Sequence, residues 1–180
     1  MMSKRTRQYL GILAALAAYY LIHEGAHLLY ALLTGVFKQI KLMGLGVQID
    51  VYAERMSDTQ MGIFCLVGAA ATFCAAYLLT ALAKKICQRN SKLFRAVFYY
   101  ITIAFLLLDP LYLSVLCSFF GGGDMNGIAL LCPEWAARLL FGVLLIINGF
   151  VFWRCVLPAY RKSFSEPIGN SSEHTERREL

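Results

Sequence analysis

Charged residues are scarce in this 180-residue chain, because Asp, Glu, Lys and Arg together make up only 16% of it. Soluble domains are about 25% charged and about 45–50% apolar, whereas this chain is 59% hydrophobic. The shortage excludes an ordinary soluble domain and indicates an integral membrane protein of one domain. The net charge of +6 does not indicate nucleic-acid binding, because the basic residues lie in short segments between apolar runs, where membrane topology explains them.

Residue types that bind metals are also few. None of the six cysteines forms a Cys-x-x-Cys pair, so we expect no thiolate zinc site and treat these residues as small hydrophobic ones. The chain has three histidines, and His174 lies in its polar C-terminal tail. Any imidazole chemistry inside the membrane domain therefore depends on His23 and His27.

Four apolar segments are long enough to cross a bilayer, which takes about 20 helical residues. They cover residues 8–34, 61–83, 93–120 and 135–156. The first follows a basic arm but is longer than the apolar core of a signal peptide, about 7–15 residues, so we interpret it as a retained transmembrane helix. These segments predict an all-α polytopic membrane protein with about four transmembrane helices, and the polar tail (163–180) is predicted to be disordered.

Two regions depart from a plain helical pattern. Asp109-Pro110 interrupts the third span, and because proline kinks or breaks helices we expect a split helix or a re-entrant piece there. Residues 37–52, between the first two spans, alternate apolar and polar side chains, with Ile40 and Leu42 on one face. This alternation predicts a short β-hairpin near the bilayer surface, and the alternative is a simple connector.

The basic residues predict the orientation in the membrane. Lys and Arg occur in the N-terminal arm, between the second and third spans, and after the fourth span. In a chain with four spans, these three segments lie on one side, which the positive-inside rule assigns to the cytoplasm. We therefore expect a multi-pass protein of the cell (plasma) membrane with both termini in the cytoplasm.

A His-Glu-x-x-His motif lies inside the first apolar segment, as His23-Glu24-Gly25-Ala26-His27. Ionisable residues are costly at that depth unless they face protein, water or a metal, so the cluster indicates a functional site. Residues four apart share one helix face, which lets both imidazoles reach a single zinc ion (Zn2+). Glu24 projects about 100° away from His23, where it can act on a zinc-bound water and need not serve as a ligand.

The third ligand has two candidates. A catalytic zinc usually has three protein ligands and one open position, and without a further histidine in the membrane domain a carboxylate is expected. Asp124 follows three glycines, whose unusual backbone angles permit a re-entrant turn toward the metal. Asp109 is deeper in the third span by simple counting, although beside Pro110 it also fits a turn residue. The residues alone leave both open.

With these features the chain resembles the site-2 protease family of intramembrane zinc metalloproteases. His23, Glu24 and His27 match the first core helix of that family, and residues 40–46 look like its glycine-containing β-segment. An aspartate from a later core span completes the zinc site in that family, and Asp124 is the better match to it.

The resemblance implies that residues 1–162 form a membrane-embedded metalloprotease domain. Zinc, bound by His23, His27 and Asp124, and Glu24 as general base would hydrolyse peptide bonds of membrane-embedded or membrane-proximal substrates. Recognition of a membrane protein or peptide would come from the membrane helices, the hairpin or a regulatory membrane partner.

Two non-enzymatic interpretations compete with a protease. In one, the same His/Glu cluster is a polar contact between helices or a path for ions in the bilayer. In the other, the protein is a metal-binding pseudoprotease that binds membrane proteins without cutting them.

Overall fold

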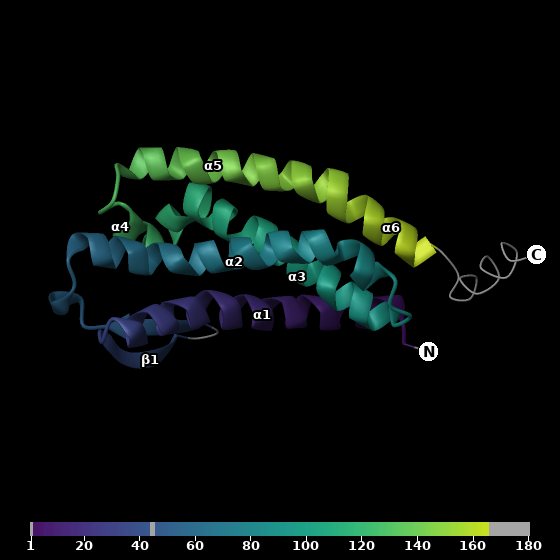
Figure 1. The fold of residues 1–180 in the computed structure, drawn as a ribbon, viewed down its shortest axis with the longest axis horizontal. Coiled ribbons are helices and arrows are strands. Elements are labelled where there is room, and N and C mark those ends of the chain that lie inside the picture. The colour runs from purple at the N-terminus through teal and green to yellow at the C-terminus, as the bar shows by residue number, and fades with distance from the viewer. Residues whose placement is uncertain (1, 44–45, 166–180) are drawn as a thin grey trace, which may run out of the picture.

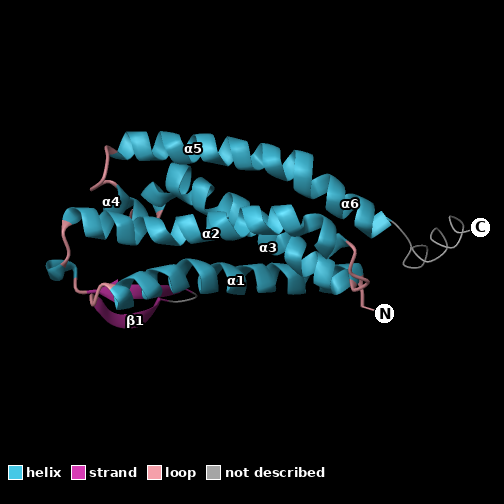
Figure 2. Cartoon of the chain, in the orientation of Figure 1, coloured by secondary structure: helices cyan, strands magenta, loops and turns pink. Residues whose placement is uncertain are grey.

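The computed structural model describes residues 2–43 and 46–165 and is mainly helical (Figures 1 and 2). Within these residues, four helical spans are long and apolar enough to cross a membrane: Lys4–Leu33, Asp58–Cys87, Lys92–Phe120 and Glu134–Ser165. A two-stranded hairpin lies between the first and second spans. The predicted all-α polytopic fold is therefore confirmed.

The first two spans are single helices, and the last two each contain a π-helical turn. The single helices are α1 (Lys4–Leu33) and α2 (Asp58–Cys87). The third span consists of α3 (Lys92–Leu111), the π-turn η2 (Tyr112–Leu116) and the 3₁₀ turn η3 (Cys117–Phe119). A short helix, α4 (Asp124–Ile128), precedes the fourth span, which consists of α5 (Glu134–Val151), the π-turn η4 (Phe152–Val156) and α6 (Leu157–Ser165).

The start of the predicted disordered tail is helical. Helix α6 continues to Ser165, and the side chain of Ser163 is buried. The prediction was wrong for residues 163–165, because polar composition alone did not reveal that this turn packs on the bundle. The rest of the predicted tail, 166–180, lies outside the described residues.

The two ends of the bundle differ in charge. The start of α1, the connection between α2 and α3, and the end of α6 lie together at one end in Figure 1, opposite α4 and the hairpin. We call it the basic end, and its charged residues are Lys4, Arg5, Arg7, Lys84, Lys85, Arg89, Lys92, Arg95, Arg161 and Lys162. None of the described residues at this end is acidic. The three basic segments therefore lie on one side, as a chain with four spans requires.

Pro110 does not split the third span, and the expected break is absent because a neighbouring helix compensates for it. Proline lacks an N–H, so the carbonyl of Leu106, four residues earlier, loses its helical partner. The amide of Asn148 on α5 donates to that carbonyl at 2.7 Å, and the Tyr77 hydroxyl of α2 donates to Asn148 Oδ1 at 2.6 Å. The third span therefore stays helical past Pro110, although its regular α geometry ends at Leu111 and the π-turn η2 and the 3₁₀ turn η3 follow.

Replacing Asn148 by Leu should destabilise the bundle. The change leaves the Leu106 carbonyl and the Tyr77 hydroxyl without partners, at a cost of about 1–2 kcal/mol. Thermal unfolding in detergent measures this effect, and Ile146→Ala, on the exposed side of the same helix, is the control. An Asn148→Leu protein as stable as the wild type would contradict this explanation of the unbroken span.

The segment after α1 forms the expected hairpin. Strands β1 (Phe37–Met43) and β2 (Gly46–Val51) are antiparallel, with Ile40 paired to Ile49 and Leu42 to Val47. Directly opposed residues lie on one face of a sheet, so the apolar residues of both strands share a face. Ile49 is buried against the helices, and β2 therefore lies along α1 beside the histidine motif.

Candidate metal centre

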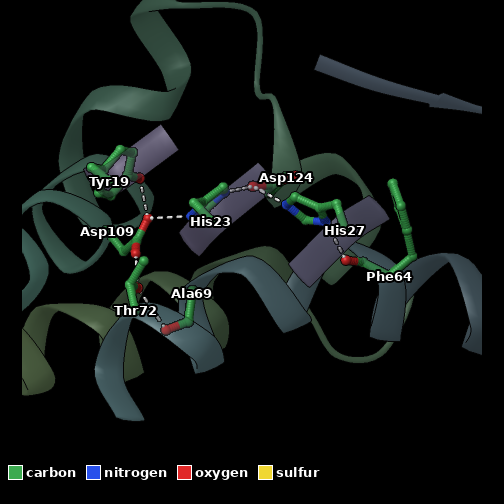
Figure 3. A network of polar contacts seen from close by, with 8 residues as sticks. All are labelled: Tyr19, His23, His27, Phe64, Ala69, Thr72, Asp109 and Asp124. Atoms are coloured by element: carbon green, nitrogen blue, oxygen red, sulfur yellow. Dashed lines mark hydrogen bonds and ion pairs between the residues drawn. The ribbon is translucent and has the colours of Figure 1, made fainter. Parts of the chain in front are cut away.

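Two histidines and one aspartate come together between α1 and α4 (Figure 3). The Nε2 atoms of His23 and His27 lie 3.1 Å and 3.6 Å from the same oxygen of Asp124, Oδ2. One potential ligand atom from each residue lies within 4.8 Å of the others. The three residues predicted to bind zinc are thus neighbours, although they are about one hundred positions apart in sequence, and close enough to share one ion.

A run of glycines brings Asp124 to this point. Gly121, Gly122 and Gly123 have φ values of 78°, 89° and 50°, which other L-residues rarely adopt. The chain therefore turns sharply after the third span and begins α4 at Asp124. Helix α4 packs on α2, where a Cβ atom on Gly127 would collide with Cys65, so the close approach needs glycine there too.

His27 is fixed in one orientation by a backbone carbonyl. Its Nδ1 lies 2.7 Å from the carbonyl oxygen of Phe64 on α2, and the only proton for this bond is on the ring nitrogen. Nδ1 therefore donates, which leaves the Nε2 lone pair of a neutral imidazole directed at Asp124. Outer-sphere hydrogen bonds of this kind orient most metal-binding histidines.

Asp109 faces the opposite edge of His23. Its Oδ1 lies 3.2 Å from Nδ1 of His23, which is the distance of an ion pair, and this buried nitrogen has no hydrogen-bond partner of regular geometry among the described residues. The hydroxyls of Tyr19 and Thr72 donate to the two carboxylate oxygens of Asp109, which is 1% exposed. Asp109 thus contacts the Nδ1 edge of His23. Of the two aspartates, only Asp124 lies near the Nε2 atoms of both imidazoles.

Gly68 of α2 packs directly against the two imidazoles. A Cβ atom at this position would lie 2.5 Å from Nε2 of His27 and 2.7 Å from Nε2 of His23. Real Cβ atoms essentially never come that close, so only glycine lets the backbone of α2 pack this closely against the Nε2 atoms of both rings. Two imidazole nitrogens and one carboxylate match the three protein ligands of a catalytic zinc site, and the residues present therefore fit a zinc ion.

The electrostatics of the site also favour a cation. Glu24, Asp109 and Asp124 surround two imidazoles, and Lys and Arg are absent from residues 8–37, 56–83 and 96–137. Carboxylates at membrane depth need a partner of opposite charge or several hydrogen bonds. A divalent metal would supply the positive charge that these stretches of the protein lack.

Glu24, the predicted base, lies next to this cluster and outside the ligand group. It is half-buried, beside the backbone of Ile49 in β2 and within electrostatic range of His23, His27 and Asp124. The Asp124 side chain is 25% exposed, against 8% for His23 and 4% for His27. The site is therefore approached from the side of Asp124, at the end of the bundle that holds the hairpin.

Two residues of the site, Phe64 and Thr72, were not assigned roles from the sequence, whereas Tyr19 was considered as a residue lining the site and Gly68 as a position of close helix packing. The Phe64 carbonyl is a backbone group and has no sequence signal. Thr72 had a weak one, because it is a polar residue one helical turn after Gly68 in an otherwise apolar span. That signal did not indicate the partner of Thr72, which is Asp109 on another helix.

Comparison with protein-family models, with curated proteins and with solved structures finds no match. The resemblance to site-2 proteases therefore depends on the sequence motifs alone and stays a prediction. Fold and site together define the class of protein as a polytopic membrane protein with a His/His/Asp cluster whose two histidines are buried.

Proposed function

We propose that this protein is an intramembrane zinc metalloendopeptidase that hydrolyses peptide bonds of membrane-embedded or membrane-proximal substrates. The observation that supports this most is the meeting of His23, His27 and Asp124 beside an acid, Glu24, that is not one of the ligands.

His23, His27 and Asp124 would hold the zinc. When bound, the ion supplies a Lewis acid that acidifies water and polarises a carbonyl group. Asp109, through its contact with His23, is a positioning residue that holds the ring with Nε2 toward the site. The Phe64 carbonyl does the same for His27.

Glu24 is the group that moves the proton. Its carboxylate accepts a proton from water while the water oxygen forms a bond to the scissile carbonyl carbon. As the C–N bond breaks, the same carboxyl group gives that proton to the departing amine. The products are a new carboxyl terminus and a new amino terminus, with Glu24 again ionised.

The hairpin offers a place for an extended substrate. A peptide must be extended to be cut, and a strand can pair with the free edge of a two-stranded sheet. Strand β2 lies beside Glu24 through Ile49, so a strand added along that edge would place its backbone near the proposed base. A transmembrane substrate would have to unwind locally to bind there.

Removal of metal is the test of this function. The purified full-length protein, in vesicles with a membrane-anchored reporter peptide, should cut the reporter, lose that activity on treatment with a chelator, and regain it with added zinc. Mass spectrometry of the fragments gives the cleavage site. Zinc binding without cleavage of any anchored reporter would favour a pseudoprotease, and absence of zinc binding would contradict the metal site itself.

A further inference from the structure

A cavity of about 540 Å³ lies at the basic end of the bundle, far along α1 from the histidines. Its walls come from three helices: the start of α1, the start of α3, and α6. Four basic side chains line it, namely Lys4, Arg7, Lys92 and Arg161. No residue of the candidate metal centre takes part in this cavity.

The lining changes from basic to apolar along the helices. Lys92, Ala96 and Tyr100 follow one another at intervals of one turn on α3, spanning about 12 Å toward the middle of the bundle. On α6, Arg161 and Leu157 follow the same order. The cavity therefore has a charged outer part and an aromatic and apolar inner part.

Tyr100 connects the inner part of the cavity to α1. A Cβ atom on Gly11 would lie 2.5 Å from the Tyr100 ring, so the ring rests directly on the backbone of α1. This contact joins α3 to α1 at the inner part, while the basic side chains lie at the ends of the helices. At the ends of transmembrane helices, such side chains lie at the level of lipid headgroups.

The charges of the cavity are not balanced within the described residues. The ion pairs of Lys38 and Lys41 with Asp50, and of Arg138 with Glu134, lie at the opposite end of the bundle. The Arg7 guanidinium donates to the carbonyl of Met2 at 2.7 Å, and no acidic side chain in the described ranges pairs with the four bases of the cavity. Four cationic side chains around one cavity favour an anion as its ligand.

We propose that this cavity binds an anionic phospholipid, with the phosphate among Lys4, Arg7, Lys92 and Arg161 and acyl-chain carbons against Ala96 and Tyr100. A free phosphate ion would use the basic part alone, and the apolar inner part is what favours a lipid. Basic pockets between transmembrane helices are suited to anionic headgroups. The proposal goes beyond the proposed proteolysis and does not depend on it.

Native mass spectrometry of the full-length protein in neutral detergent tests the proposal. We expect one dioleoylphosphatidylglycerol to bind at least about tenfold more tightly than dioleoylphosphatidylcholine, and inorganic phosphate at equal concentration not to displace it. Each basic side chain of the cavity should contribute about fivefold to the affinity for phosphatidylglycerol. The triple variant Lys4→Gln/Arg7→Gln/Arg161→Gln should therefore lose the preference for this lipid. The matched control, Lys84→Gln/Lys85→Gln/Arg89→Gln, removes the same charge from the same end outside the cavity and should keep it.

Arg161→Gln alone is the second variant, because a single change at an exposed position leaves the fold intact. It should weaken the binding of phosphatidylglycerol by about fivefold. Equal binding of both lipids, equal loss in the cavity and control variants, or an unchanged affinity in Arg161→Gln would overturn the proposal. Displacement by inorganic phosphate would also overturn it, in favour of a free phosphate site.

Discussion

Replacing Glu24 by Gln is expected to reduce cleavage of a membrane-anchored reporter by about 10²- to 10⁴-fold while zinc remains bound. Glutamine has nearly the same shape but cannot accept the proton of the attacking water. The ligands His23, His27 and Asp124 are unchanged, so zinc content should equal that of the wild type. Single-turnover cleavage, measured beside metal analysis of the same samples, separates loss of the base from loss of the metal.

Glu54→Gln is the matched control for this substitution. It makes the same chemical change at an exposed position in the 3₁₀ turn η1 (Ala53–Arg55), which precedes α2 and is not part of the cluster. Cleavage by this variant should equal that of the wild type. Substantial cleavage by Glu24→Gln would show that another group moves the proton and that the proposed mechanism is wrong.

Replacing Gly68 by Ala is expected to weaken zinc binding by at least about 100-fold, a loss at the upper limit of those caused by changes around metal ligands. The added methyl group would lie 2.5 and 2.7 Å from the Nε2 atoms of His27 and His23, so both rings must move. Neither a ligand nor the proposed base is altered. Zinc affinity, measured by competition with a chelating dye, should therefore fall together with cleavage.

Gly25 provides the control for that experiment. It lies between the two histidines in sequence, but a Cβ atom there meets nothing within 4 Å. Gly25→Ala should therefore bind zinc as the wild type does, and its helix should be as stable or slightly more stable. Full zinc affinity in Gly68→Ala would mean that the ion does not lie on the face of the imidazoles that α2 covers.

The sequence predicted the features that have a periodic or compositional origin. The four spans follow from hydropathy, the hairpin from alternation in residues 37–52, and the shared face of His23 and His27 from helical spacing. Each depends on residues that are close in sequence. The prediction of a break at Pro110 was wrong because Asn148, which donates to the Leu106 carbonyl in place of the missing N–H, lies on a different helix.

No local sequence pattern indicated which side of His23 each of the two aspartates would face. Asp124 and Asp109 both contact His23, and only the glycine turn and the packing of α4 on α2 determine which nitrogen each one faces. By its position along the third span, Asp109 was expected to lie deeper than Asp124, and in the structure Asp109 is the more buried of the two. Which nitrogen of the His23 ring each aspartate faces is a separate property from burial, and only the folded structure shows it.

Zinc content of the wild type, Asp124→Ala and Asp109→Asn, measured side by side at saturating zinc, tests the central claim most directly. We predict about one zinc per chain in the wild type, little or none in Asp124→Ala, and full content in Asp109→Asn with an affinity lowered about 10- to 100-fold. The asparagine keeps the shape of Asp109 but weakens its hold on His23. Zinc retained in Asp124→Ala and absent from Asp109→Asn would contradict this account and make Asp109 the third ligand.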